Sequence, residues 1–394
     1  MAAAIYTSDA LDALTSIKVG ERFPQGSAAS ILQTVANRGP DAIPVLEVLR
    51  LRAYAVLNER IGTTVHYRGL LEFSNECACN CIYCGIRALN TTVRRFSLTL
   101  EEIVQTARWC ATNGYGSITL QSGEQSDPAF THFVEEAVCA IKLETATPQQ
   151  PEGLGITLCC GEQSLDTFLR WKKAGALRYL LRFETSNPEL YRQLHPDAPE
   201  GLSGRLEALA RLHTAGYRVG TGTMIGIPGQ TVADMADDLE TLASCGAHMV
   251  GMGPYLPHAQ TPLGKSLNPL LLPDRTRFQL GLAMVGLCRL RLPGINIAST
   301  TALQALHPFG RERGLDFGAN ILMPLVTPER VRADYLLYDG KPCIDDAKDS
   351  CRDCLATRVA SVNRPVGWYE YGDQPIIQPG YNQNKAFAKK RSKS

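Results

Sequence analysis

The sequence predicts an α/β fold, a parallel (β/α)8 barrel of the TIM type, and three patterns indicate it. Short apolar segments alternate with amphipathic helical segments through eight units between residues 61 and 326. Several apolar segments are nearly continuous, as parallel strands buried on both faces should be. Glycine follows many helical segments, as in Asn113-Gly114 and Cys245-Gly246, and supplies the left-handed conformation that ends a helix. An N-terminal helical extension and a C-terminal extension are expected to flank the barrel.

Residues 1–60 form the expected helical extension, because apolar residues between Leu46 and Leu57 recur at helical spacing ahead of Gly62. This extension should pack on the outside or the bottom of the barrel. The barrel is assigned to residues 61–326, and its expected strands are 68–73, 117–121, 155–159, 176–183, 217–224, 247–254, 295–300 and 318–324. The expected helices between them are 100–112, 129–143, 164–174, 203–215, 232–244 and 274–290.

Three further segments are expected to lie away from the chemistry of the barrel. A loop rich in Pro and Gln, residues 144–153, looks like an insertion on the far side. Residues 327–371 form a C-terminal segment that carries a second group of cysteines. Residues 372–394 turn polar and end in a basic run, which is typical of a disordered, solvated tail. The alternative for this tail is the stump of a linker to another domain.

The composition excludes several classes of protein. The formal net charge of +1 gives no electrostatic argument for nucleic acid or a membrane surface as the partner. No apolar run reaches the ~18 residues that a membrane-spanning helix needs. The start of the chain lacks the charged and apolar regions of a secretory signal. Thirteen cysteines therefore indicate a reducing compartment, the cytoplasm or an organellar stroma or matrix in a eukaryote, with metal-bound thiols.

The cysteines at 77–84 form the most informative motif. Cys77, Cys81 and Cys84 are separated by three and two residues, so one loop can wrap three thiolates around one metal centre. A structural zinc site normally closes with a fourth ligand, whereas a four-iron cluster with three protein ligands leaves one iron open for chemistry. Cys79 lies inside the same run, and an alternative ligand set that includes it stays open.

This spacing, with the aromatic Tyr83 before the last Cys, resembles the signature of the radical S-adenosylmethionine (SAM) superfamily. The resemblance implies a 4Fe–4S cluster whose open iron binds SAM, and reductive cleavage of SAM to a 5′-deoxyadenosyl radical. Polar residues at the expected carboxyl ends of the strands suit such a cofactor. Glu124 with Ser122 suits its ammonium group, Arg205 suits its carboxylate, and Glu184 suits its ribose or ammonium.

A narrower resemblance covers roughly residues 40–360 and concerns the HydE family of FeFe-hydrogenase maturases. It is carried by Glu72-Phe-Ser-Asn75, Leu120-Gln-Ser-Gly-Glu124, Arg178-Tyr-Leu-Leu-Arg182, Glu184-Thr-Ser-Asn-Pro188, Gly226-Ile-Pro-Gly-Gln-Thr231, Met249-Val-Gly-Met-Gly-Pro254 and Pro257-His-Ala-Gln-Thr-Pro262. The resemblance implies an organometallic or cysteine-derived substrate, a cysteine-bound iron carbonyl cyanide unit made by the tyrosine-cleaving maturase. Other hydrogenase maturases and a reductant are the implied partners.

The resemblance also implies roles for individual residues. The cluster ligands are Cys77, Cys81 and Cys84, and the positions lining SAM are Tyr83, Gln121, Ser122, Glu124, Arg182, Glu184 and Arg205. The implied substrate cavity and anion sites comprise Thr157, Arg178, Met224, Thr300, Thr301 and Met323. The chain departs from the family pattern at Phe183, where members of the family usually have a His, at Cys159-Cys160, and in the 144–153 loop.

Near the end of the chain, Cys343, Cys351 and Cys354 resemble an auxiliary iron–sulfur site found in some members of the family. They are expected to be dispensable for the reaction, and free surface thiols are the alternative. Two functional alternatives also remain. One is a radical SAM enzyme of the biotin synthase or methylornithine synthase type. The other is an iron–sulfur carrier or scaffold without radical chemistry.

Overall fold

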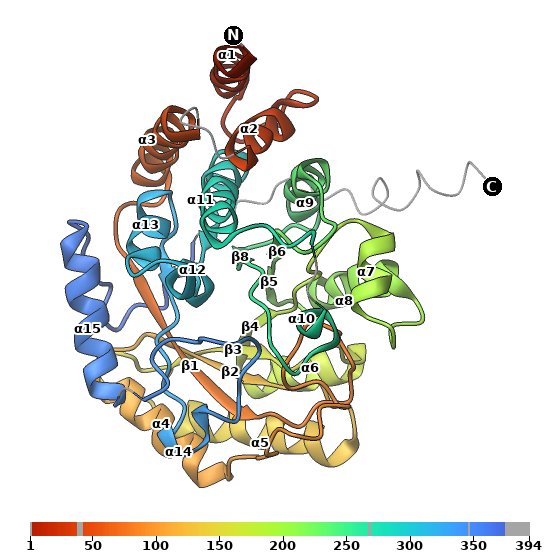
Figure 1. Ribbon diagram of the computed structural model, residues 1–394. Helices are drawn as coiled ribbons and strands as arrows, with labels where there is room; N and C mark the ends of the chain where they lie inside the picture. Colours follow the sequence, from red (N-terminus) through yellow and green to blue (C-terminus); the bar gives the residue numbers. More distant parts are fainter. Residues whose placement is uncertain (1, 38–41, 267–268, 346, 375–394) are drawn as a thin grey trace.

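The computed structural model describes residues 2–37, 42–266, 269–345 and 347–374. Within these residues a parallel sheet of eight strands has the order β10-β1-β2-β3-β4-β5-β7-β9. Its strands are β1 (His66–Ser74), β2 (Ser117–Ser122), β3 (Gly155–Cys159), β4 (Ala176–Leu180), β5 (Arg218–Thr221), β7 (Met249–Val250), β9 (Asn296–Ile297) and β10 (Ile321–Leu322). A parallel bridge between Ala298 and Ile321 joins the two edges of the sheet. The expected parallel barrel is therefore confirmed as a nearly closed ring (Figure 1).

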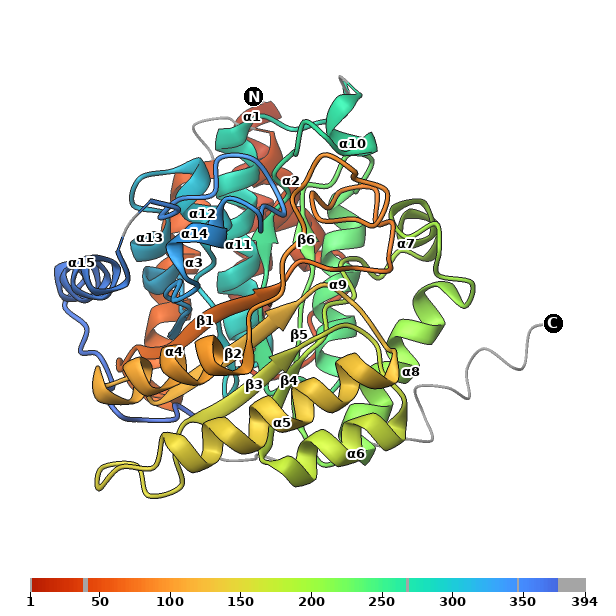
Figure 2. The ribbon, with the colours of Figure 1, turned by 90° about the horizontal axis from the view of Figure 1, so that it is seen from below.

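Helices connect the strands and surround the ring. Those of the barrel are α4 (Leu100–Thr112), α5 (Pro128–Glu144), α6 (Leu165–Ala174), α7 (Pro188–Leu194), α8 (Gly201–Thr214), α9 (Val232–Ser244), α10 (Pro262–Lys265), α11 (Asp274–Arg291), α12 (Thr301–Leu306) and α13 (Gly310–Asp316). Capping boxes begin two of them, because Thr99 and Glu102 bond each other's backbone N–H groups, as do Thr231 and Asp234. Figure 2 shows α4, α5 and α6 on the outside of β1 to β4.

The strands expected at 176–183, 217–224 and 247–254 are shorter in the structure than the apolar patterns predicted. The later part of two of them forms a separate pair, β6 (Met224–Ile225) and β8 (Gly253–Pro254). The interruption falls where the backbones of Gly222 and Gly251 come close, since a Cβ on Gly222 would lie 1.9 Å from the Gly251 carbonyl oxygen. Apolar pattern alone does not reveal such a backbone contact, because it reports burial rather than hydrogen bonding.

The extension ahead of the barrel consists of α1 (Ala2–Ser16), α2 (Ser27–Ala36) and α3 (Ala42–Arg60). Helices α2 and α3 pack against α11, and α2 also contacts α9 (Figure 1). The extension thus lies on the outside of the barrel, which is one of the two expected positions. Gly62 follows α3 with a φ of 90° and donates its N–H to the Leu57 carbonyl, so it ends the helix as expected.

The C-terminal segment includes α14 (Glu329–Arg332) and α15 (Lys348–Ser361) and then closes the amino end of the barrel. Val366 pairs with Val65 just before β1, and the Trp368 ring meets the Tyr67 ring edge-on at 5.4 Å. The 144–153 loop lies at this end too, and the Gln150 amide donates to the Tyr369 carbonyl at 3.0 Å.

The carboxylate of Asp373 neutralises a group of arginines beneath the barrel. It forms two hydrogen bonds with Arg178, at 2.6 and 2.7 Å, and lies 3.7 Å from Arg68 and 3.8 Å from Arg218. Burial alone would raise the pKa of Asp373, but Arg178 and the two other arginines outweigh burial and lower it. The predicted start of the tail at residue 372 is therefore too early, because Gly372–Gln374 belong to this closure. The rest of the predicted tail, 375–394, lies outside the described residues.

Replacing Asp373 by Asn should destabilise the fold in a pH-dependent way. The variant leaves three cations beneath the barrel without their carboxylate, so we expect a loss of about 3 kcal/mol in unfolding free energy near neutral pH. A carboxyl whose pKa is lowered by folding stabilises above its unfolded pKa of about 4 and loses this contribution below it. The difference between wild type and variant should therefore shrink as the pH falls below about 4.

Anaerobic urea denaturation across this pH range would measure the effect. Asp237→Asn, which removes an exposed carboxylate from α9, is the matched control and should change little. Equal stability of Asp373→Asn and wild type at neutral pH would show that the carboxylate does not hold the closure.

Candidate active site

The cysteine loop runs between β1 and the start of α4 and has little regular structure of its own. Several of its carbonyl groups are instead satisfied by one side chain, Arg95. The Arg95 guanidinium donates to the carbonyls of Asn75 and Arg87 at 2.6 Å and of Ile86 at 2.7 Å, with longer contacts to Ala88 and Asn90. This cation therefore ties the two ends of the loop together.

The thiols of Cys77, Cys81 and Cys84 line one cavity of about 360 Å³ at the carboxyl ends of the strands. The Cys77 sulfur accepts N–H groups from Cys79 and Glu124, both at 3.4 Å. The hydrogen bond with Cys79 lowers the pKa of Cys77 to about 6, whereas burial raises the pKa of Cys81 to about 12. The loop after β2 approaches this closely because residue 123 is Gly: a Cβ there would lie 2.2 Å from the Glu76 carbonyl oxygen.

The chemistry of this donor set fits an iron–sulfur cluster. Three cysteine thiols and N–H groups directed at sulfur are the features that hold and tune such clusters. In the described part of the chain, no three His, Cys, Asp or Glu side chains gather around a single-ion position. A multi-iron cluster does not need that convergence, because its thiolates bind different iron atoms. Cys79 lines the same cavity, so the alternative ligand set stays open.

Tyr83 is fixed by a hydrogen bond to His195 on the far side of the loop. Burial, followed by the charge of Arg205, lowers the pKa of His195 to about 4, so the ring is neutral at physiological pH. Its Nδ1 lies 3.0 Å from the Tyr191 carbonyl and must donate there. Its Nε2 therefore accepts from the Tyr83 hydroxyl at 3.1 Å, which orients the aromatic ring beside the cysteines.

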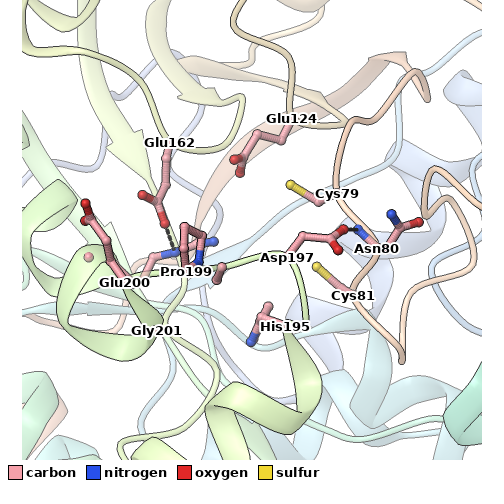
Figure 3. Close-up of a pocket in the computed structure, with 13 residues that line it drawn as sticks. Cys79, Asn80, Cys81, Glu124, Glu162, His195, Asp197, Pro199, Glu200 and Gly201 are labelled. Carbon is pink, nitrogen blue, oxygen red and sulfur yellow. Dashed lines mark hydrogen bonds and ion pairs between the residues drawn. The ribbon is translucent and has the colours of Figure 1, made fainter.

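Arg205 on α8 is the cation of the adjoining pocket of about 250 Å³, which Figure 3 shows between the cysteine loop and α8. Its Nε lies 2.6 Å from a Glu162 carboxylate oxygen, and its Nη1 donates to the Arg182 carbonyl at 3.1 Å. Burial disfavours its charge, but Tyr191 and the carboxylates of Glu162 and Glu124 outweigh burial and raise its pKa. Glu162 was not among the predicted site residues, although it follows β3 on the same rim.

Glu184 occupies an unusual backbone conformation beside this cation. Its φ of 64° lies in the left-handed region, which a residue with a side chain adopts at a cost of order 1–3 kcal/mol. Its carboxylate forms a 2.8 Å ion pair with Arg182, and burial raises its pKa. Such strain is commonly retained where a side chain must be aimed at a ligand.

The structure brings most of the predicted site residues into the large cavity. Besides the cysteines, the predicted residues that line it are Tyr83, Gln121, Ser122, Glu124, Arg182, Glu184, Arg205, Met224, Thr300, Thr301 and Met323. Cys159 lines it as well, whereas Cys160 and Phe183 are buried. Residues that were not predicted to belong to the site also contribute, namely Tyr335, Tyr338 and Lys341 from the C-terminal segment and Glu72 from β1.

Thr157 and Arg178 are not part of this cavity, in contrast to their predicted role. They are neighbours on β3 and β4 and line a separate cavity of about 350 Å³ beneath the barrel, with Asp373. The reason is their position along the strands: each is the middle residue of a five-residue strand, below the rim that carries Glu124 and Glu184.

Two of the three C-terminal cysteines lie together, outside the lining of the large cavity. A hydrogen bond with Cys343 lowers the pKa of Cys351, which is buried at the start of α15, to about 7. Cys354 lies on the same helix and is exposed. Helix α15 packs beside α13 on the outer surface (Figure 2), so this group does not line the large cavity.

Comparison with known proteins shows the family of this chain. The model of the Radical SAM superfamily matches residues 71–242. A curated relative, the [FeFe] hydrogenase maturase subunit HydE of Thermotoga maritima, is 40% identical over 82% of this chain and 87% of its own length. The 3-methylornithine synthase of Methanosarcina barkeri is 26% identical over 75% of this chain and 79% of its own length.

Solved structures share the fold. A crystal structure of methylornithine synthase superposes with a TM-score of 0.71 at 22% identity, covering 92% of this chain and 98% of its own. A crystal structure of HydG, a maturase of the [FeFe]-hydrogenase, also has a TM-score of 0.71, at 20% identity over 89% of this chain and 74% of its own. No helix among the described residues has the length and apolarity to cross a membrane. The cysteine loop, the barrel and the 40% identity to a curated maturase together place this chain in the radical SAM superfamily, as a member of the HydE family.

Proposed function

We propose that this enzyme carries out the radical SAM step in maturation of FeFe-hydrogenase, acting on a cysteine-bound iron carbonyl cyanide precursor of the two-iron subcluster. The observation that carries the proposal is the 40% identity to HydE over 87% of that protein's length. Other hydrogenase maturases and a low-potential reductant are the proposed partners. None of the thirteen cysteines forms a disulfide, which supports a reducing compartment, the cytoplasm or an organellar stroma or matrix.

The residues of the rim fit a 4Fe–4S cluster with SAM. Cys77, Cys81 and Cys84 would hold three irons, and the reduced cluster supplies, when bound, the electron that cleaves SAM to a 5′-deoxyadenosyl radical. Arg205 faces the pocket with its guanidinium and suits the SAM carboxylate. The half-buried Glu124 and the buried Glu184 supply two carboxylates for the ammonium and the ribose.

The remainder of the cavity suits a compact substrate with hydrogen-bond acceptors. Met224 and Met323 give it an apolar wall that excludes water. The Thr300 hydroxyl is buried on this wall and has no hydrogen-bond partner within the described structure. A buried hydroxyl without a partner costs free energy, so a ligand that accepts its hydrogen bond would be favoured. Carbonyl, cyanide and carboxylate groups are such acceptors.

A methylornithine synthase type of rearrangement is the second candidate, supported by the 26% identity to 3-methylornithine synthase. Both candidates need SAM cleavage and differ in the substrate. Anaerobically reconstituted protein with SAM and reductant should therefore be offered either the iron carbonyl cyanide product of the tyrosine-cleaving maturase or L-lysine. We expect activation of apo-hydrogenase with the first, in the presence of the remaining maturation proteins, and no methylornithine from the second. Methylornithine formation, or SAM cleavage without any activation, would contradict the proposed function.

The two groups of cysteines should differ in their effect on SAM cleavage. Replacing Cys77, Cys81 and Cys84 by Ala should remove the rim cluster and abolish 5′-deoxyadenosine formation, because no other thiol set lines the cavity at this spacing. Replacing Cys343 and Cys351 by Ala should lower bound iron, if a second cluster is present, and leave 5′-deoxyadenosine formation near wild type. Iron analysis, electron paramagnetic resonance and product chromatography measure these outcomes. Loss of cleavage in the folded Cys343/Cys351 variant would show that the second group takes part in the reaction.

Arg205→Ala should weaken SAM binding while the cluster stays in place. Loss of one partner of a charge-assisted contact in a dry pocket costs ~1.5–3 kcal/mol, which is about tenfold to over a hundredfold in affinity. Calorimetric titration of the reconstituted protein with SAM provides the dissociation constant, and the absorbance of the cluster provides the control. Glu162→Gln removes the carboxylate that Arg205 contacts but keeps the cation, so it should retain more affinity than Arg205→Ala. Wild-type affinity in Arg205→Ala would make this residue structural only.

A further inference from the structure

We propose that Lys341 is a positioning residue of the reaction cavity: paired with Glu72, it holds the segment Asp334–Lys341 closed over the carboxyl end of the barrel. We call this segment the lid. The inference rests on the proposed function only in taking the large cavity as the place of reaction. Neither residue is needed to bind the cluster or SAM in the assignments above, so their presence on the cavity wall calls for a different role.

The ion pair itself is buried and complete. The Lys341 Nζ lies 2.6 Å and 2.8 Å from the two oxygens of the Glu72 carboxylate and 3.2 Å from the Tyr335 carbonyl. The Lys341 side chain is 9% exposed and that of Glu72 is 2% exposed. These three contacts use all three N–H groups of the ammonium. Lys341 is thus occupied in holding protein groups rather than available to a substrate.

The pair joins two distant parts of the chain across the rim. Glu72 is on β1, beside Gln121 on β2, and Lys341 comes from the segment that follows α14. Between them the lid carries Tyr335 and Tyr338 into the cavity wall, and the Tyr335 hydroxyl accepts from the Gln121 amide at 3.2 Å. The pair therefore fixes the aromatic side chains that separate the cavity from solvent on this side.

The other contacts of the lid are made to the cysteine loop and to the segment that follows β8. The Asn75 amide donates to the Asp334 carbonyl at 2.7 Å, and the Gly85 N–H donates to the Leu337 carbonyl at 3.1 Å. On the opposite side, Asp339 bonds the backbone at Pro257 and Ala259. Two further pairs lie at the ends of the lid, where the Arg94 guanidinium donates to the Asp334 carboxylate at 3.0 Å and His258 lies 3.7 Å from Asp339. The lid has no helix or strand of its own, and Lys341 with Glu72 is the ion pair that is buried on both sides.

Loss of one partner of a buried ion pair is strongly destabilising, because the other charge stays buried. Removing only the ammonium leaves the buried Glu72 carboxylate without its hydrogen-bonded counter-charge, since the remaining cation, Arg332, acts on it more weakly than Lys341 does. Opening of the lid would let water reach that carboxylate. Removing both charges together avoids this penalty but also removes the ion pair. Comparison of wild type, the two single variants and the double variant therefore separates two effects. A lone buried charge lowers stability in a single variant, whereas loss of the ion pair opens the lid in the double variant as well.

The test measures lid opening and access of solutes to the cavity in the anaerobic, cluster-loaded protein with SAM and without any further substrate. Hydrogen–deuterium exchange of the peptide covering 334–341 should become about tenfold faster or more in Lys341→Met than in wild type, and Lys341→Arg should restore much of the protection. Arg170→Met, which breaks a 2.7 Å ion pair with Glu135 between α5 and α6 outside the barrel, is the matched control and should leave the lid unchanged.

A second readout follows the same opening in the reaction. In D2O, a small added thiol that enters the cavity can transfer the deuterium atom of its S–D group to the 5′-deoxyadenosyl radical. The S–D bond breaks, a C–D bond forms in 5′-deoxyadenosine, and two of the resulting thiyl radicals couple to a disulfide. We expect a severalfold larger deuterated fraction in Lys341→Met than in wild type. If that variant does not fold, the Glu72→Gln/Lys341→Met double variant, which leaves no lone buried charge, should show both effects. Wild-type exchange of the lid and a wild-type deuterated fraction in a folded variant would overturn the proposal, whatever the hydrogenase assay shows.

Discussion

The arrangement of the rim depends on the hydrogen bonds that the Arg95 guanidinium donates to carbonyls of the cysteine loop. A loop that leaves a strand without forming regular structure still has to satisfy its backbone carbonyl groups. Arg95 donates to the Asn75 carbonyl at the start of the loop and to carbonyls between Ile86 and Asn90 at its end, which holds the loop in one compact form. The three thiols then face the cavity, and the loops after β2 and α14 have a fixed surface against which to pack.

Much of the fold could be predicted from local signals. The helices expected at 100–112 and 232–244 have these bounds in the structure, because a capping residue begins each and glycine follows each. The cysteine loop could be predicted for a related reason, since its three candidate ligands are close in sequence and their spacing alone restricts the chemistry. Thr157 and Arg178 show where such signals fail. Alternation along a strand indicates which side chains face the interior of a barrel, but not whether they lie at its upper or lower end.

The pairs that close the barrel could not be predicted, because their partners are far apart in the sequence. Arg178 and Asp373 are 195 residues apart, and Glu72 and Lys341 are 269 residues apart. In a sequence, Lys341 and Asp373 look like ordinary surface charges on polar segments. Only the fold places each opposite a buried charge of the other sign. Long-range electrostatic partners of this kind leave no periodicity or spacing that a reading of one sequence could detect.

Both ends of the barrel are closed by residues that follow its last strand. Lys341 acts at the carboxyl end and Asp373 at the amino end, and both come after β10 along the chain. Ribosomes add residues in order, at roughly 5–20 per second, and earlier segments can fold before later ones exist. During synthesis, the ring of strands can therefore form while both of its ends are still open to solvent. During that interval the cavity that the cysteine loop lines at the carboxyl end is still without Tyr335, Tyr338 and Lys341 on its wall.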